Sequence, residues 1–285
     1  MRQHVIIRLL SILYFVKVLT ATAAASDGVG LKLETEENLV QGGLVHGQVL
    51  PGYSVSVLGH KPIVDATGKF VFGLGRDTPE EIVLVVTGRD HRTTEHKLTV
   101  KQRQYAIQKI EGVEDKYVEP PSEVLARIRS ENILVAKARQ TLRQENQFAS
   151  GFILPASGPI TGVYGSQRIF NGVPKRPHFG LDIAGPVGTK VVAPAAGKVS
   201  LAHNDMYYSG GTLIVDHGQG VSSTFIHLSK ILVAQGDDVQ QGQLIAEIGA
   251  TGRVTGPHLD WRVNWFDQRL DPALLLPKSL NLESK

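Results

Sequence analysis

Two short clusters near the C-terminal end of the chain combine residue types that bind metal ions or transfer protons. The first is His178-Phe-Gly-Leu-Asp182, and the second, about eighty residues later, is Gly256-Pro-His258-Leu-Asp260. A third histidine, His227, lies between them in Phe225-Ile-His-Leu-Ser229. Three separate segments thus each bring a histidine among strand-like residues bounded by glycines. We expect them to form one site built from several strands.

The spacing within each cluster favours convergence of its side chains. In an extended strand, residues two or four positions apart point to the same side. His258 and Asp260 should therefore project together, while the apolar residues that alternate with them face the core. His178 and Asp182 can face one point if their segment is extended, or if a turn at Gly180 brings them together.

Such a set of residues is suited to metal-assisted hydrolysis. A catalytic zinc site needs three His, Asp or Glu ligands and one open position, and His178, Asp182 and Asp260 can supply the ligands. Hydrolysis also needs a base and a donor for the tetrahedral oxyanion, for which His227 and His258 remain available. Alternatively, these are ordinary loop and strand-end residues satisfied by hydrogen bonds, because each spacing alone often occurs by chance.

The pattern of the whole chain predicts a mainly β fold. Short alternating segments separated by turn signals indicate a small antiparallel, sandwich-like β-domain over residues 29–103. Glycine-punctuated strands over 150–277 indicate a compact all-β catalytic domain, followed by a tail at 278–285. Histidines without ligand spacing are expected at surface, strand or turn positions: His46, His60, His91, His96 and His217.

A helical linker is predicted between these parts, over residues 120–148. Pro120-Pro121-Ser122 opens it, with Ser122 as the expected N-cap. Apolar residues are expected near one face: Leu125, Ile128, Val135, Ala138 and Leu142. Its mixed charges are expected to form a solvated face. The alternative is a helix at 122–147 that docks an envelope protein or borders a substrate groove.

Composition restricts the compartment and the partners. Residues 1–25 have a basic start, an apolar run and a small-residue end, which is the pattern of a signal peptide. We therefore expect export to the periplasm or cell envelope without a stable membrane span, an uncleaved anchor being the alternative. The chain has no cysteine, which excludes disulfides and thiolate zinc ligands. A net charge of +3 without basic clusters gives no support for nucleic-acid binding.

Several motifs resemble the lysostaphin-type zinc metallopeptidases, which cut peptidoglycan cross-links. The resemblance runs in order over 150–277 and includes Gly165-Ser-Gln-Arg168, Pro177-His-Phe-Gly-Leu-Asp-Ile-Ala184, Gly188-Thr-Lys-Val-Val-Ala-Pro194, Asp216-His-Gly218, His227-Leu-Ser229 and Gly249-Ala-Thr-Gly-Arg-Val-Thr-Gly-Pro-His-Leu-Asp260. It implies a β-sheet groove with zinc at its base and endopeptidase action on cell-wall peptides. It also implies His178 and Asp182 as the first metal pair, and His227 and His258 as the catalytic histidines.

One residue departs from the family pattern. Where the family usually has a second histidine as the third ligand, this chain has Asp260. We expect Asp260 to bind one Zn²⁺ together with His178 and Asp182. Two carboxylates and one imidazole roughly cancel the charge of the ion, and other divalent metals such as Mn²⁺ become better competitors.

The sequence favours a zinc-dependent endopeptidase that hydrolyses peptidoglycan peptides by metal-activated water. The alternative is a weak or inactive relative that binds the wall or activates another wall hydrolase. A binding-only relative has no need for His178, Asp182, His227 and His258 together, and all four are present. A third reading is a lipoyl-type carrier hairpin at 236–243, which is disfavoured because the region has no suitable lysine.

Overall fold

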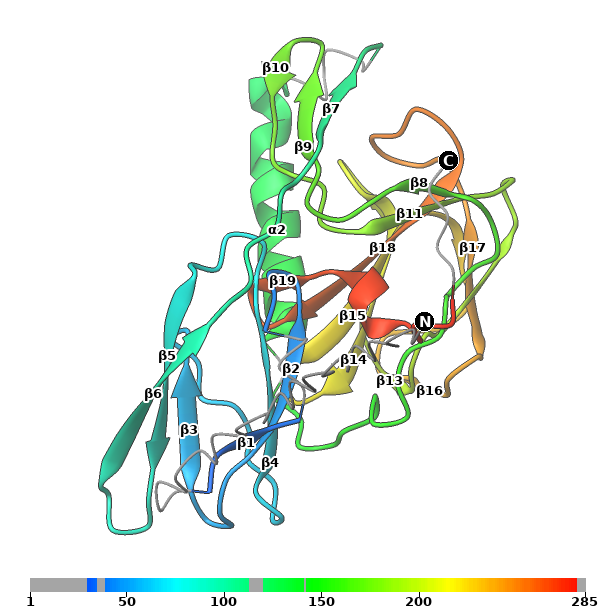
Figure 1. Ribbon diagram of the computed structural model, residues 1–285. Coiled ribbons are helices and arrows are strands. Elements are labelled where there is room, and N and C mark those ends of the chain that lie inside the picture. The colour runs from blue at the N-terminus through cyan, green and yellow to red at the C-terminus, as the bar shows by residue number, and fades with distance from the viewer. Residues whose placement is uncertain (1–29, 35–38, 113–119, 141, 281–285) are drawn as a thin grey trace, which may run out of the picture.

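The computed structural model describes residues 30–34, 39–112, 120–140 and 142–280 (Figure 1). The expected signal peptide at 1–25 lies outside these residues. The described chain is mainly β, with small N-terminal antiparallel sheets, one α-helix and a large C-terminal antiparallel sheet, which confirms the predicted fold class. No helix of this described part is long and apolar enough to cross a membrane.

The N-terminal part consists of two three-stranded antiparallel sheets. One contains β1 (Lys32–Leu33), β2 (Leu44–Gln48) and β4 (Lys69–Gly73), and the other contains β3 (Ser54–Val57), β5 (Glu81–Thr87) and β6 (Thr93–Thr99). Along β5 the apolar residues alternate between buried and more exposed positions, so Ile82, Leu84 and Val86 face the interior. This period of two is the pattern expected of a sheet with one solvated face.

The C-terminal part is one ten-stranded antiparallel sheet. Its main path runs β16-β13-β14-β15-β18-β11-β8, with β12, β17 and β19 paired off this path. The strands are β8 (Ile160–Gly162), β11 (Leu181–Ala184), β12 (Lys190–Val192), β13 (Gly197–Met206), β14 (Gly210–Gly218), β15 (Val221–Ile231), β16 (Asp238–Val239), β17 (Leu244–Ile248), β18 (His258–Trp265) and β19 (Gln268–Leu270). A short 3-10 helix, η3 (Pro272–Leu275), follows.

The N-terminal and C-terminal sheets share one hydrophobic core. That core contains side chains from both parts, including Phe72 of β4 and Trp265 of β18. At Gly73 the backbone of β4 approaches so closely that a Cβ there would lie 2.6 Å from Cβ of Trp265. The packing explains why a chain without disulfides keeps the two parts together. The domain boundaries given above remain predictions.

A third small sheet joins the segment that follows the N-terminal sheets to the segment between β8 and β11 of the large sheet. In it β7 (Ile107–Ile110) pairs in parallel with β9 (Gln167–Phe170), which pairs with β10 (Val173–Pro174). Such short strands carry little sequence pattern and were not predicted. The sheet fixes the segment that leads into His178, because the backbone N–H of His178 donates to Ser166 O.

The helical segment is shorter than the predicted range. A 3-10 turn, η2 (Ser122–Val124), leads into α2 (Leu125–Arg139), and no side chain caps either start. Beyond it the chain pairs with the turn between β14 and β15: Gln147 donates to His217 O and Gln219 donates to Arg143 O. These backbone bonds replace the helical ones expected up to residue 148.

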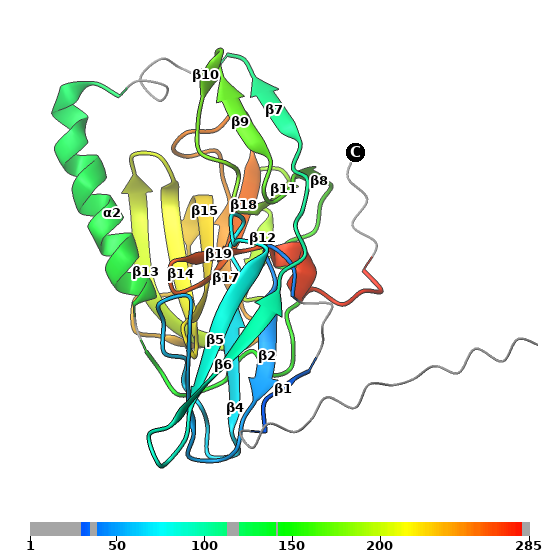
Figure 2. The same ribbon diagram turned by 60° about the vertical axis from the view of Figure 1, so that its left-hand side comes forward.

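One face of α2 packs on β13 and β14 (Figure 2). Val135 and Ala138 contact a small apolar cluster of Leu201, Met206 and Ile214. Leu125 and Leu142, which were expected on the same face, are exposed. The predicted solvated face is also incomplete, because Glu131 is buried and its carboxylate accepts a hydrogen bond from the backbone N–H of Tyr207.

His217 is a buried structural residue of β14. Its Nδ1 lies 2.7 Å from Ala196 O and its Nε2 lies 2.8 Å from Ser223 Oγ. Because a carbonyl oxygen only accepts, Nδ1 carries the hydrogen and Nε2 accepts from the serine. Burial lowers the pKa of His217 from 6.5 to about 4; the hydrogen bond to Ala196 O opposes this shift, and the charge of Arg143 adds to it.

We predict that His217 makes the protein less stable in mild acid. Its pKa is lower in the folded than in the unfolded chain, so its contribution is complete above about pH 6.5 and falls as the pH approaches 4. The loss is roughly 3 kcal/mol in the free energy of unfolding. Urea unfolding of wild type and His217→Gln at several pH values measures it. Identical pH slopes for both proteins would contradict the prediction, and His203→Gln on β13 is the control.

Candidate metal centre

The two carboxylates of the site lie side by side in the large sheet. Strands β11 and β18 pair with Asp182 opposite Asp260, and β8 adds Gly162 on the far side of Asp182. On β18 the alternation is as predicted, with Leu259 and Trp261 in the core and the polar residues on the opposite face. The register therefore places both aspartates at one point on the polar face of the sheet.

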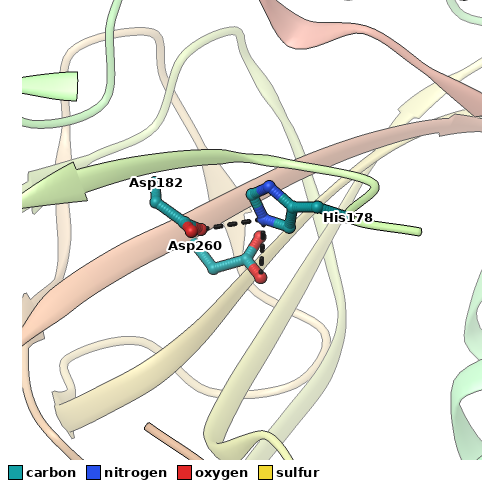
Figure 3. Close-up of side chains that lie close together, drawn as sticks. All are labelled: His178, Asp182 and Asp260. Atoms are coloured by element: carbon teal, nitrogen blue, oxygen red, sulfur yellow. Dashed lines mark ion pairs between the residues drawn. The ribbon is translucent and has the colours of Figure 1, made fainter. Parts of the chain in front are cut away.

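His178 completes a compact cluster with these aspartates (Figure 3). It lies in the loop before β11, and its Nε2 is 2.9 Å from Asp182 Oδ1 and 3.4 Å from Asp260 Oδ2. One ligand atom from each of the three residues lies within 4.8 Å of the others. All three side chains are buried.

Two atoms of this cluster have no hydrogen-bond partner among the described residues. They are His178 Nε2 and Asp182 Oδ1, which approach each other but not in hydrogen-bonding geometry. The other ring nitrogen, His178 Nδ1, lies 3.2 Å from Val163 O and must carry the hydrogen. In the neutral ring a lone pair on Nε2 thus faces a carboxylate oxygen, and this arrangement becomes favourable when a cation lies between the two atoms or when Nε2 is protonated.

Two glycines provide the space for the carboxylates. A Cβ at Gly162 would overlap Asp182 Oδ2, and a Cβ at Gly180 would overlap Asp260 Oδ1. Any other residue at these positions must displace the aspartate beside it. Gly180 therefore has a steric role: because it has no side chain, the loop that carries His178 can pass directly over Asp260.

Each carboxylate is also held by an arginine. Arg168 Nη2 donates to Asp182 Oδ2 at 2.9 Å, which leaves Oδ1 for the cluster. Arg262 binds Asp260 with Nε 3.0 Å from Oδ1 and Nη2 2.6 Å from Oδ2. Two negative and two positive side chains thus balance at the centre, an arrangement that lowers the cost of burying the carboxylates.

The pKa directions follow from these contacts. Burial raises the pKa of Asp260, but Arg262 and His178 outweigh burial and hold this pKa well below its usual value. Burial likewise raises the pKa of Asp182, and His178 and Arg168 bring it below the usual value. For His178 burial lowers the pKa, while the two aspartates raise it further than burial lowers it. Both carboxyl groups are therefore ionised at neutral pH.

His227 reaches the site through a β-bulge. The register between β14 and β15 shifts between the Leu213–Phe225 and Gly211–Leu228 pairs, and His227 has a left-handed φ of 68°. A histidine in this conformation is strained, and such a bulge redirects a side chain. The backbone N–H of His227 donates to Ser209 O, which stabilises the bulge.

The two remaining histidines lie next to each other at the edge of the cluster. The ring centroids of His227 and His258 are 5.0 Å apart, and His258 Nε2 is 3.9 Å from Asp182 Oδ1. In each ring Nδ1 lies 2.8 Å from a carbonyl oxygen, that of Thr251 for His227 and that of Gly256 for His258. Both rings therefore carry a hydrogen on Nδ1, and the neutral form of each ring has its lone pair on Nε2.

The structure brings together all five residues that the sequence analysis singled out. Burial, together with the charge of His258 but against that of Asp260, lowers the pKa of His227 to about 4, so its ring is neutral at physiological pH. The sequence placed Arg168 in one of the motifs named above, and its alternation placed Arg262 on the same face of β18 as Asp260, two residues away. Neither arginine was assigned a role at the site from sequence.

The family model of Peptidase family M23 matches residues 176–272. Peptidoglycan DD-endopeptidase ShyB of Vibrio cholerae is 37% identical over 142 residues, which cover 49% of this chain and 30% of that protein. Peptidoglycan DD-endopeptidase ShyA of Vibrio cholerae is 31% identical over 202 residues, which cover 67% of this chain and 46% of that protein. The chain thus spans less than half the length of these curated relatives.

A solved structure extends the similarity beyond the matched family segment. A crystal structure of an M23 protein from Pseudomonas aeruginosa has a TM-score of 0.66 and 31% sequence identity, and covers 83% of this chain and 94% of its own. A match of this extent includes N-terminal sheets as well as the large sheet. The arrangement of both parts is therefore shared with that protein.

We predict that Gly180→Ala disrupts the cluster. The added methyl group collides with Asp260 Oδ1 and lies next to Trp261 O, so Asp260 must move away from His178. Overpacking of this kind costs about 1–3 kcal/mol of stability, and divalent-metal affinity should fall at least about tenfold. Calorimetric metal titration and thermal unfolding measure the two effects. Gly256→Ala is the control, since no atom lies within 4 Å of its added Cβ; equal affinities for the two variants would contradict the prediction.

Proposed function

Because this chain belongs to Peptidase family M23, we propose that it is a zinc-dependent endopeptidase that hydrolyses peptide cross-links of bacterial peptidoglycan. The observation that carries the proposal is the pair of buried atoms His178 Nε2 and Asp182 Oδ1, which face each other without a hydrogen-bond partner. The matched family segment contains both of them, together with His227, His258 and Asp260.

The donor set fits a zinc ion held by His178, Asp182 and Asp260. One imidazole nitrogen and two carboxylate oxygens are ligands that zinc accepts, and three protein ligands leave a coordination position for a reactant. Each ligand is oriented by a further contact: Val163 O for His178, Arg168 for Asp182 and Arg262 for Asp260. Contacts of this kind fix ligand orientation in known metal sites.

The arginines change the expected charge balance. From sequence, two carboxylates were expected to cancel the charge of the ion. Arg168 and Arg262 already neutralise Asp182 and Asp260, so the charge of a bound ion is not cancelled by this set. When bound, the ion supplies Lewis acidity, polarising the scissile carbonyl and making a water more acidic. The Asp260–Arg262 pair thus compensates for the missing second histidine.

His227 and His258 are proposed to perform the proton transfers. Both keep an Nε2 lone pair because Nδ1 is bound to a backbone carbonyl. A neutral ring of this tautomer takes a proton at Nε2 and, once protonated, donates it to a developing oxyanion or a leaving amine. The lowered pKa of His227 means that it returns the proton readily. The two rings are adjacent, so one can accept while the other donates.

The substrate class and location are inferred from the relatives. The two curated relatives are named peptidoglycan DD-endopeptidases, which act on the cell wall. We propose the same substrate class here, with export to the periplasm or envelope directed by residues 1–25. The alternative of a relative that only binds the wall or activates another hydrolase is distinguished by direct digestion.

We predict that the protein releases peptides from purified sacculi and that removal of metal stops it. Chelator should abolish release, one equivalent of Zn²⁺ should restore it, and His227→Ala should lower the rate by about 10²–10⁴-fold, the usual contribution of a proton-transfer group. Chromatography of the soluble products measures this. His203→Ala on β13 is the matched control.

A wall-binding relative gives a different result. In that case wild type and His227→Ala sediment with sacculi equally and release no peptides, with or without zinc. Metal analysis of the purified protein adds a second readout, because the proposal requires about one zinc per chain. Sedimentation without peptide release, or purified protein without zinc, would favour the non-catalytic alternative.

We predict that Arg262→Met destabilises the metal-free protein more than the zinc-bound protein. Without Arg262, the buried Asp260 carboxylate loses its ion pair, which costs about 3–5 kcal/mol of unfolding free energy. Zinc then neutralises Asp260, so the stabilisation by zinc should exceed that of wild type. Urea unfolding with chelator and with zinc measures both. The same zinc-dependent stabilisation in both proteins would contradict the role assigned to Arg262.

A further inference from the structure

A cavity of about 490 Å³ adjoins the metal centre and is unusually rich in positive charge. It is bounded by α2 on one side, by residues 168–179 on another and by the polar face of the large sheet as its floor. His178 and His227 both line it, so it opens onto the cluster. Six arginines and one lysine line it, and no Asp or Glu of the described residues does.

Only part of this positive charge is used by the metal centre. Arg168 and Arg262 pair with Asp182 and Asp260. By contrast, Arg139, Arg176 and Arg269 form no ion pair with any carboxylate of the described residues. The metal centre therefore needs two of the cavity's arginines and leaves others with no acidic partner.

Arg139 comes from α2, whose charged side chains were predicted to form a solvated face. Its Nη2 donates to Thr224 Oγ1 at 2.9 Å, and its Nε is buried without a hydrogen-bond partner. Thr224 is opposite Arg262 in the β15–β18 ladder. The helix thus places a guanidinium directly over the polar face of the sheet, beside the arginine that holds Asp260.

Arg269 comes from β19 at the same face. Its Nη1 is 3.3 Å from Asn264 Oδ1, and its guanidinium lies 5.7 Å from the ring centroid of Phe179. Burial, with the charges of Arg262 and Arg176, lowers the pKa of Arg269 to about 10. Burial and the charges of Arg269 and Arg262 also lower the pKa of Arg139. These guanidinium groups repel one another, so an anion among them is strongly favoured.

We propose that this cavity is a carboxylate-binding subsite, which selects peptides with free carboxylate groups next to the bond that is cut. The inference rests on the proposed function and specifies its substrate. A cavity of this size holds a few residues of a peptide. The planar fork of a guanidinium matches a carboxylate with two parallel hydrogen bonds, and the aromatic side chains Phe179 and Tyr208 line the same cavity. A peptide without carboxylates would leave the arginines uncompensated.

Binding of soluble wall peptides to the metal-free protein tests the subsite without requiring hydrolysis. The probes are cross-linked muropeptides, peptides that still carry their sugars, released from sacculi by a muramidase, and the same muropeptides after their carboxyl groups are converted to amides. Calorimetry in chelator should show at least about tenfold weaker binding after amidation, as expected for loss of charge-assisted hydrogen bonds. Equal affinity for the two probes would overturn the proposal.

Variants assign the effect to the cavity. Arg139→Gln and Arg269→Gln should each weaken binding of the unmodified peptides about five- to tenfold, with little change for the amidated peptides. Arg139→Lys should recover only part of the loss, because it keeps the charge without the fork. Arg129→Gln, at an exposed position of the same helix, is the control and should change neither. Equal losses on both probes would indicate a structural role and overturn the proposal.

Two further outcomes separate this proposal from the proposed function. Hydrolysis of both probes at the same rate would support the peptidase and refute the subsite. Selective binding without hydrolysis by the zinc-loaded protein would support the subsite and refute the peptidase. Tighter binding of a phosphate-bearing wall polymer than of the peptides would show that the arginines serve phosphate groups, which would also overturn the proposal.

Discussion

The burial of two neighbouring carboxylates is the constraint on which the rest of the site depends. Asp182 and Asp260 are paired across β11 and β18 with little access to water, where two unpaired negative charges would be very unfavourable. The structure compensates with one arginine for each carboxylate and a histidine between them. Arg168 leaves Asp182 Oδ1 directed at His178 Nε2, and a cation or a proton between these two atoms satisfies that arrangement.

The fold meets this constraint through backbone geometry. Antiparallel pairing of β11 and β18 fixes the two aspartates, and the glycines at 162 and 180 let neighbouring segments pass over them. A bulge turns His227 toward the same point, and backbone carbonyls set the tautomer of each histidine. The surrounding elements then shape the approach to the site: α2 and the segment before β11 wall a cationic cavity whose floor is the sheet. The proposed metal site and the proposed carboxylate-binding subsite thus lie on the same face of one sheet.

Much of this could be predicted from the sequence because it depends on short-range periodicity. The mainly β class, the strands near 44, 54, 69 and 82 and the alternation of β18 follow from residue patterns, and the five site residues follow from spacing and the resemblance to a known family. Features that depend on pairing between residues distant in the sequence could not be predicted. The end of α2 at Arg139, the parallel β7–β9 pair, the burial of Glu131 and the hydrogen bond from Arg139 to Thr224 all depend on distant backbone or side-chain partners that no local pattern reveals.

The central claim is that one zinc ion binds between His178 Nε2, Asp182 Oδ1 and Asp260 Oδ2. The most direct test is an anomalous difference map from crystals of the protein grown with one equivalent of zinc, measured on both sides of the zinc absorption edge. We predict one dominant peak, about 2.0–2.2 Å from each of these three atoms, with Arg262 still paired with Asp260. Absence of a peak there, or a peak that excludes Asp260 while Asp260 stays paired with Arg262 alone, would contradict it.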